Sequence, residues 1–132
     1  MIVVDSSVWI DYFNGKKTTK TDWLYSALGN MPIIIGDLIL TEVLQGFQKE
    51  KDFKTAKDLL LCFPFMTMTG KELAVESAIN YKLLRRKGVT VRKTFDVIIG
   101  TFCIHYHLHL LHDDRDFDPI EKFLKLKVIR TY

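Results

Sequence analysis

The stretch TFDVIIGTFCI, residues 94–104, constrains the fold most, because one aspartate sits inside an otherwise largely apolar segment. Read as a helix, this stretch has no polar face, so we expect it to be buried all round. A buried ionised carboxylate costs free energy unless it is paired, hydrogen-bonded or bound to a metal. The fold must therefore bring a partner to Asp96, and the rest of the chain indicates which kind.

Short apolar runs alternate with segments of helical periodicity along all 132 residues. The apolar runs predict strands at residues 1–5, 32–36, 63–68, 107–111 and 126–131. The intervening segments predict helices at residues 6–14, 21–29, 37–47, 51–63, 70–88, 94–104 and 117–124. Such alternation favours an α/β fold, with a central parallel sheet of four to five strands flanked by helices. No linker or repeat divides the chain, so we expect one domain over residues 1–132.

Several local expectations follow from single residues. Asp37 and Thr94 are suited to cap the helices that begin beside them. Pro64 would confine its strand to an edge of the sheet. Cys62 and Cys103 lie in apolar contexts, which favours buried thiols over a disulfide or a zinc site.

Four acidic residues are predicted to meet at one edge of this sheet. Asp5 ends the first strand, Glu42 lies in the helix after the second, Asp96 opens its helix, and Asp114 follows the strand LHLL. The carboxyl ends of parallel strands are where such sheets bind ligands. Clustered carboxylates repel one another, so the arrangement makes sense mainly if a hard divalent cation lies among them. Oxygen-only ligands favour Mg²⁺ or Mn²⁺ over zinc.

Each acid also has a purely structural interpretation. Asp5 could cap the first helix, Asp96 could favour a helix N-terminus through its dipole, and Asp114 could be a turn residue. Glu42 could be a surface glutamate, although apolar neighbours surround it in sequence. Among the other aspartates nearby, Asp116 is close enough to Asp114 to share a metal or a water.

Basic residues form two clusters, one at residues 49–57 and one in RRKGVTVRK, residues 85–93. With a mild net charge of +3, each cluster could be a solvated face or a rim that faces phosphates. His105 and His109 have the spacing of a metal pair on a helix, but the glutamate of a metalloprotease motif is absent. Ser7, two residues after Asp5, excludes a phosphatase that needs Asp-x-Asp there. The N-terminus lacks the features of a signal peptide, so we expect a cytoplasmic protein.

Four motifs taken together resemble a known family. IVVDSSVWIDYF, LTEVLQGF, TFDVIIGTF and LLHDDRDFDPI, in this order and spacing, resemble the PIN-domain ribonucleases, and most of all the VapC-type toxins of bacterial toxin–antitoxin pairs. By position, Asp5, Glu42, Asp96 and Asp114 match the acidic site of the family, with Asp5, Asp96 and Asp114 as metal ligands. Ser7 matches its small hydroxyl residue, whereas His112 stands where the family often has Thr or Ser.

The resemblance implies a Mg²⁺-dependent endoribonuclease that hydrolyses single-stranded or loop RNA, with Mn²⁺ as a substitute cation. It also implies a homodimer and a small inhibitory antitoxin protein, and no membrane. A catalytically inactive RNA-binding module of the same fold is the alternative. Such a module would have no reason to keep four converging acids, because it would need basic and aromatic residues instead.

Overall fold

The strands of the computed structural model, which describes residues 1–131, all run parallel in one sheet of order β3-β2-β1-β4. They are short and comprise β1 (Ile2–Val4), β2 (Ile33–Gly36), β3 (Phe65–Met66) and β4 (His109–Leu111). The predicted parallel α/β architecture is therefore confirmed. Strand β3 follows Pro64 directly and lies at an edge, as the missing N–H of proline requires.

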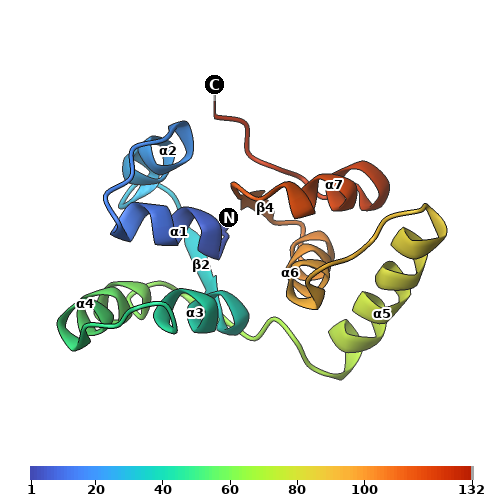
Figure 1. Ribbon diagram of the computed structural model, residues 1–132, viewed down its shortest axis with the longest axis horizontal. Coiled ribbons are helices and arrows are strands. Elements are labelled where there is room, and N and C mark those ends of the chain that lie inside the picture. The colour runs from blue at the N-terminus through green and yellow to red at the C-terminus, as the bar shows by residue number, and fades with distance from the viewer. Residues whose placement is uncertain (132) are drawn as a thin grey trace.

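Helices connect and flank these strands. They are α1 (Ser6–Phe13), α2 (Thr19–Ala27), α3 (Asp37–Leu44), α4 (Glu50–Leu60), α5 (Lys71–Arg86), α6 (Thr94–His105), the short 3₁₀ helix η1 (Arg115–Phe117) and α7 (Asp118–Leu124). Figure 1 shows the first turns of α1 and α3 near the middle of the molecule, beside α6. Parallel strands end at the same edge, so the helices that follow them also begin there. Within residues 1–131, no helix is long and apolar enough to cross a membrane.

The core forms around the sheet and α6. All residues of β1 and β2 are buried, and Trp9, Phe102 and Phe117 are wholly inaccessible to solvent. Helix α6 is less enclosed than its sequence predicted, because Phe95 is 41% exposed and Ile98 is half-buried. The first turns of α6 therefore reach the molecular surface, where Asp96 itself stays buried.

Two predicted helix caps are wrong. Lys93, not Thr94, is the N-cap residue of α6, and Gly36, not Asp37, is that of α3. Neither helix has a side-chain cap hydrogen bond. The Asp37 carboxylate instead accepts from its neighbour Leu38 N–H and from Met68 N–H, at 3.0 and 2.9 Å. Asp37 thus fastens the start of α3 to the chain just after β3.

Two further predictions fail at the surface. Cys103 is buried as expected, but Cys62 is exposed, and its thiol donates to the Asp58 carbonyl at the end of α4. The fifth strand, predicted at residues 126–131, is reduced to a single parallel bridge between Leu110 and Val128. Two backbone hydrogen bonds make this bridge, from Leu110 N–H to the Lys127 carbonyl and from Ile129 N–H to the Leu110 carbonyl, both at 2.9 Å.

Gly100 sets how closely α6 and α7 approach. A Cβ atom at Gly100 would lie 2.8 Å from Cγ2 of Ile120 on α7, whereas one at the loop residue Gly46 would meet only a carbonyl at 3.6 Å. Helix propensity alone predicts that Gly100→Ala stabilises the protein, by about 1 kcal/mol. The stiff, buried Ile120 side chain reverses this sign.

We expect Gly100→Ala to lower the free energy of unfolding by roughly 1–3 kcal/mol, as overpacking does. Urea unfolding, followed by circular dichroism, measures the change. Gly46→Ala is the matched control and should leave stability within about 0.5 kcal/mol of the parent. A Gly100→Ala variant as stable as the parent would show that α7 can retreat without cost.

Candidate active site

Asp5 follows β1 directly and uses only one of its carboxylate oxygens within the fold. Its Oδ2 accepts from the N–H of Ser7 at 3.1 Å and from the Ser7 hydroxyl at 2.7 Å, so Asp5 does cap α1. Its Oδ1 is buried and has no hydrogen-bond donor among residues 1–131. Burial raises the pKa of Asp5, and the Ser7 hydrogen bonds oppose that effect. The capping role therefore leaves one carboxylate oxygen free for another ligand.

Asp96 lies in the first turn of α6 and is 4% exposed. Its Oδ2 accepts no hydrogen bond in the described part of the chain, and its nearest cation is Lys93 Nζ at 3.4 Å. Burial raises the pKa of Asp96 to about 7, the negative charges of Asp5 and Asp114 add to the effect, and Lys93 opposes it. The carboxylate predicted to need a partner has only a partial one.

Asp114 follows β4, and its carboxylate is well supplied with donors. Its Oδ1 accepts from the N–H of Asp116 at 2.9 Å, and its Oδ2 accepts from Lys93 Nζ at 2.6 Å. Burial works to raise the pKa of Asp114, but these hydrogen bonds outweigh it, so the pKa is lowered. Asp114 therefore stays ionised at neutral pH and carries the most secure negative charge of the site.

Glu42 on α3 is half-buried, and its Oε1 accepts from the Ser6 hydroxyl on α1 at 3.2 Å. Burial raises the pKa of Glu42, and the charge of Asp5 raises it further. A glutamate with a raised pKa is better suited to accept a proton near neutral pH than an exposed one.

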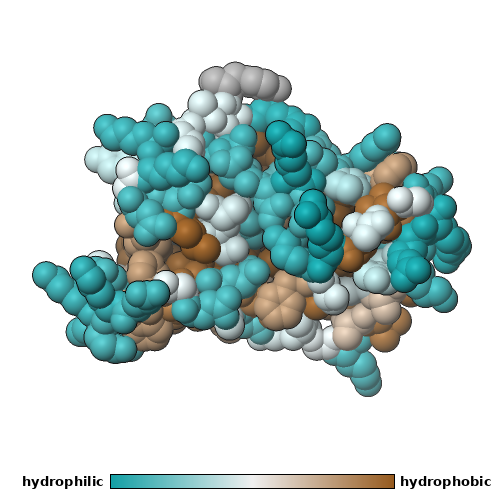
Figure 2. Space-filling view, viewed as in Figure 1, coloured by the Kyte–Doolittle hydropathy of each residue, from teal (hydrophilic) through white to brown (hydrophobic). Residues whose placement is uncertain are grey.

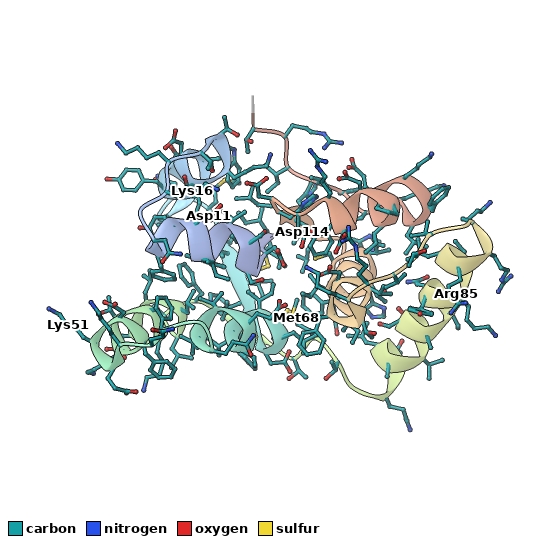
Figure 3. The ribbon with its side chains drawn as sticks, in the orientation of Figure 1. Asp11, Lys16, Lys51, Met68, Arg85 and Asp114 are labelled. Atoms are coloured by element: carbon teal, nitrogen blue, oxygen red, sulfur yellow. The ribbon has the colours of Figure 1, made fainter. Side chains whose placement is uncertain are left out.

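The structure brings the predicted acids together in two adjoining groups. Carboxylate oxygens of Asp96, Asp114 and Asp116 all lie within 4.8 Å of one another. Asp5 and Glu42 lie outside that tight group, but the charge of Asp5 raises the pKa of both Asp96 and Glu42. Figure 3 places Asp114 near the middle of this face, between α1 and α6, and Figure 2 shows hydrophilic residues gathered in the same region.

Ser7 and His112 hold the backbone that carries these acids. The Ser7 hydroxyl accepts from Asp113 N–H at 3.0 Å, and His112 Nδ1 accepts from Asp114 N–H at 3.2 Å. The His112 ring packs against Phe117 with 4.9 Å between ring centroids, and burial lowers the pKa of His112. A neutral imidazole can therefore serve as the acceptor that fixes Asp114 in place.

Sequence reasoning assigned Lys93 to a basic rim and missed its place among the acids. Its ammonium group contacts Asp114 at 2.6 Å, Asp96 at 3.4 Å and Asp116 at 3.8 Å. Arg92 contacts Asp116 at 3.4 Å. The only sequence signal is the spacing Lys93-x-x-Asp96, which puts both side chains on one side of the first turn of a helix.

The two basic clusters lie at opposite ends of the molecule, where Figure 3 labels Lys51 on α4 and Arg85 on α5. Only the second cluster reaches the acids, through the loop after α5. A cavity of about 350 Å³ opens there beside the acidic site. Basic, acidic and apolar side chains line it, among them Arg92, Lys93, Arg115, Asp96, Asp116, Val91, Pro119 and Ile120.

His105 and His109, whose spacing resembles a metal pair, do not share a helix. His109 lies on β4 and is exposed, while His105 ends α6, so the run crosses from helix to strand. His105 Nδ1 lies 3.1 Å from each carboxylate oxygen of Glu76 on α5. With Glu72 it makes a small cluster away from the sheet edge.

The residues present fit a hard divalent cation. Two buried carboxylate oxygens, Asp5 Oδ1 and Asp96 Oδ2, have no hydrogen-bond donor within residues 1–131. The other possible metal ligands nearby are also carboxylate oxygens, from Asp114 and Asp116. Such a donor set suits Mg²⁺ or Mn²⁺.

Comparisons with known proteins agree on one family. A family model described as PIN domain matches residues 2–122. Two curated relatives are VapC ribonuclease Mb1587 of Mycobacterium bovis and ribonuclease VapC11 of Mycobacterium tuberculosis. Each is 26% identical to this chain over 129 residues, which cover 96% of this chain and 96% of the relative.

Solved structures share the fold. One is VapBC2 from Rickettsia felis bound to a DNA fragment from their promoter, with a TM-score of 0.77, 16% identity and 98% coverage of both chains. Another is a toxin–antitoxin complex from Klebsiella pneumoniae, with a TM-score of 0.72 and 20% identity, covering 100% of this chain and 98% of that one. At such identities the likeness concerns the fold alone.

The raised pKa of Asp96, about 7, predicts how the metal-free protein responds to pH. The folded state keeps a proton that the unfolded chain loses near pH 4, so stability falls as pH rises between these values, and the penalty is full above pH 7. Asp96→Asn removes this penalty. In a chelator at pH 8 it should melt higher than the parent, by on the order of 5 °C.

Thermal melts of both proteins from pH 4 to pH 8 in chelator test this expectation. The difference in melting temperature should be near zero at the acid end and grow toward pH 8. The exposed neighbour Asp113→Asn is the control. If Asp96→Asn melts clearly lower at pH 8, the contact of Asp96 with Lys93 outweighs the cost of burying the Asp96 charge, and the expectation is wrong.

Proposed function

This chain belongs to the PIN-domain family, and from that membership and the acidic site we propose that it is a divalent-metal-dependent endoribonuclease. Its substrate would be single-stranded or loop RNA, and it would act in the cytoplasm as the toxin of a toxin–antitoxin pair. The observation that carries the proposal is the pair of buried carboxylate oxygens, Asp5 Oδ1 and Asp96 Oδ2, that accept no hydrogen bond within residues 1–131; only the Lys93 ammonium, 3.4 Å from Asp96 Oδ2, is close to one of them.

Asp5, Asp96 and Asp114 would hold the cation, with Asp116 as an accessory ligand. A bound Mg²⁺ or Mn²⁺ would supply water activation and would stabilise the negative charge that develops on the phosphate. Ser7 supports this arrangement, because its hydroxyl fixes the Asp5 carboxylate and accepts from the backbone that leads to Asp114. Because Oδ2 of Asp5 is held by Ser7 at the start of α1, the orientation of the other oxygen, Oδ1, is fixed as well.

Glu42 would accept the proton that the attacking water loses. Its raised pKa suits a general base, and the Ser6 hydroxyl holds one of its oxygens in place. Glu42 lies on α3, whereas Asp96 lies on α6 and Asp114 follows β4, so base and cation would approach the phosphate from different elements.

The cavity beside Asp96 supports RNA as the substrate. Arg92 and Arg115 line it together with apolar residues such as Val91, Pro119 and Ile120. Its volume of about 350 Å³ suits part of a nucleotide. Basic side chains bind the phosphate backbone, and an apolar wall offers a surface for a base.

A small antitoxin protein and a second copy of this chain are the proposed partners. A VapBC complex and a toxin–antitoxin complex are among the proteins of the same fold. An arginine of the antitoxin could neutralise the acidic site, because guanidinium binds carboxylates in a bidentate manner. For the homodimer, the support is the exposed apolar side chains Tyr25, Leu61, Phe65, Val75 and Ile79, which are 52–73% exposed.

The inactive RNA-binding module is the second candidate, and RNA cleavage decides between the two. We expect purified protein to cut total RNA in the presence of Mg²⁺ or Mn²⁺ and to stop when the cation is chelated. Mapping the new RNA ends by sequencing measures this. Cleavage that survives exhaustive chelation would contradict the metal, and binding of RNA without cleavage under any divalent cation would favour the module.

Substitutions should separate the site from its surroundings. Asp5→Asn, Glu42→Gln, Asp96→Asn and Asp114→Asn should each reduce the cleavage rate by roughly 100-fold or more, because each removes a charge from the reacting centre. The matched controls Asp113→Asn and His105→Ala should cleave at the parent rate. Loss of activity in the His105 variant, with the aspartate variants active, would place the metal at the Glu72–Glu76–His105 cluster instead.

The homodimer has its own test. Light scattering at micromolar concentration should give twice the mass of the 15.4 kDa chain. Two double variants, Leu61→Glu with Phe65→Glu and Val75→Glu with Ile79→Glu, would show which exposed face forms the contact. A parent protein that stays monomeric at these concentrations would contradict the proposal.

A further inference from the structure

The ammonium group of Lys93 lies among carboxylates that would hold the cation of the proposed metal site. Its ammonium nitrogen is 2.6 Å from Asp114 Oδ2 and 3.4 Å from Asp96 Oδ2, and it is 3.8 Å from Asp116 Oδ2. These three residues are the same ones whose oxygens gather within 4.8 Å of one another. One positive charge thus touches every member of the tightest carboxylate group of the site.

The position of Lys93 in the chain allows its ammonium group to leave without disturbing the fold. Its backbone is fixed as the N-cap residue of α6, three residues before Asp96. Its side chain is 48% exposed, whereas that of Asp96 is 6% exposed. A long, flexible four-carbon stem can carry the charge away from the carboxylates while the backbone stays in place. The Lys93 side chain also lines the 350 Å³ cavity beside the acids, so its ammonium group could move into that cavity.

We propose that Lys93 is a built-in counter-cation, which neutralises Asp96 and Asp114 in the metal-free protein and is displaced into the adjoining cavity when a divalent cation binds. The inference rests on the metal site of the proposed function and adds a residue that controls its occupancy. A lysine is suited to this exchange because its ammonium is a compact point charge with no bidentate grip on carboxylates. In the cavity it would join Arg92 and Arg115 against the RNA backbone.

Metal binding to Lys93→Met tests the exchange, since methionine keeps the length of the stem and lacks the charge. Calorimetric titration with Mg²⁺ and with Mn²⁺ should show roughly tenfold tighter binding than in the parent, because the cation no longer competes with an ammonium a few ångströms away. In chelator at pH 8, Lys93→Met should melt lower than the parent, and saturating Mg²⁺ should close that gap.

Arg92→Met is the matched control. It removes a neighbouring positive charge whose side chain is 77% exposed and contacts only Asp116 of the group, so its metal affinity should change less than twofold. An equal gain in both variants would mean that general charge, not occupancy by Lys93, sets the affinity, and would overturn the proposal. Unchanged or weaker metal binding in Lys93→Met would overturn it as well.

Chemical labelling reports the displacement itself. Acetylation of lysines by an N-hydroxysuccinimide ester, quantified by peptide mass spectrometry, should modify Lys93 several-fold faster in saturating Mg²⁺ than in chelator, with Lys87 as the unchanged internal control. A Lys93 rate that does not respond to Mg²⁺ would overturn the exchange even if the protein cleaves RNA. If neither parent nor Lys93→Met binds a divalent cation, this inference and the metal of the proposed function both fail.

Discussion

Mutual repulsion among carboxylates at one sheet edge is the constraint on which the rest of this structure depends. Parallel pairing of β2, β1 and β4 brings the ends of these strands together, and an acid follows β1 and β4 within three residues. Helix α6 adds Asp96 from its first turn. The fold offsets the repulsion with hydroxyl groups, backbone N–H donors and one lysine, and it leaves Asp5 Oδ1 and Asp96 Oδ2 unsatisfied within residues 1–131.

The supporting contacts divide the site into fixed and adjustable parts. Asp5 and Asp114 are held by short-range bonds from residues two positions along the chain, so their orientation follows from local backbone geometry. Asp96 lacks such a bond, and its environment is set by the Lys93 side chain and by the charges around it. Its protonation is therefore the most sensitive to what else occupies the site, whereas hydrogen bonds from Lys93 and from Asp116 N–H lower the pKa of Asp114.

The sequence was most informative where backbone hydrogen bonding imposes a periodic pattern or excludes a residue type. Alternating apolar runs predicted the parallel sheet, and Pro64 predicted the edge strand, because both rest on backbone hydrogen bonding. Caps were less predictable: Asp37 and Thr94 are good capping types, but neither helix has a side-chain cap hydrogen bond, and the Asp37 carboxylate accepts from the distant Met68 N–H instead. The exposure of Cys62 and Phe95 depends on where each helix end projects beyond the core, which no local pattern records.

The sequence indicated a functional role for the acidic residues but not for Lys93, the lysine that lies among them. Buried acids in an apolar context carry a thermodynamic signal, since each demands a partner. A lysine in a run of basic residues gives no such signal, because lysine side chains are ordinarily exposed. Its role becomes visible only from the distances to Asp96 and Asp114. If a metal, an antitoxin arginine and Lys93 bind the same oxygens, each must weaken the other two, and linkage makes that weakening reciprocal. The antitoxin would then inhibit by taking the place of the metal, while Lys93 would weaken the binding of both to these oxygens.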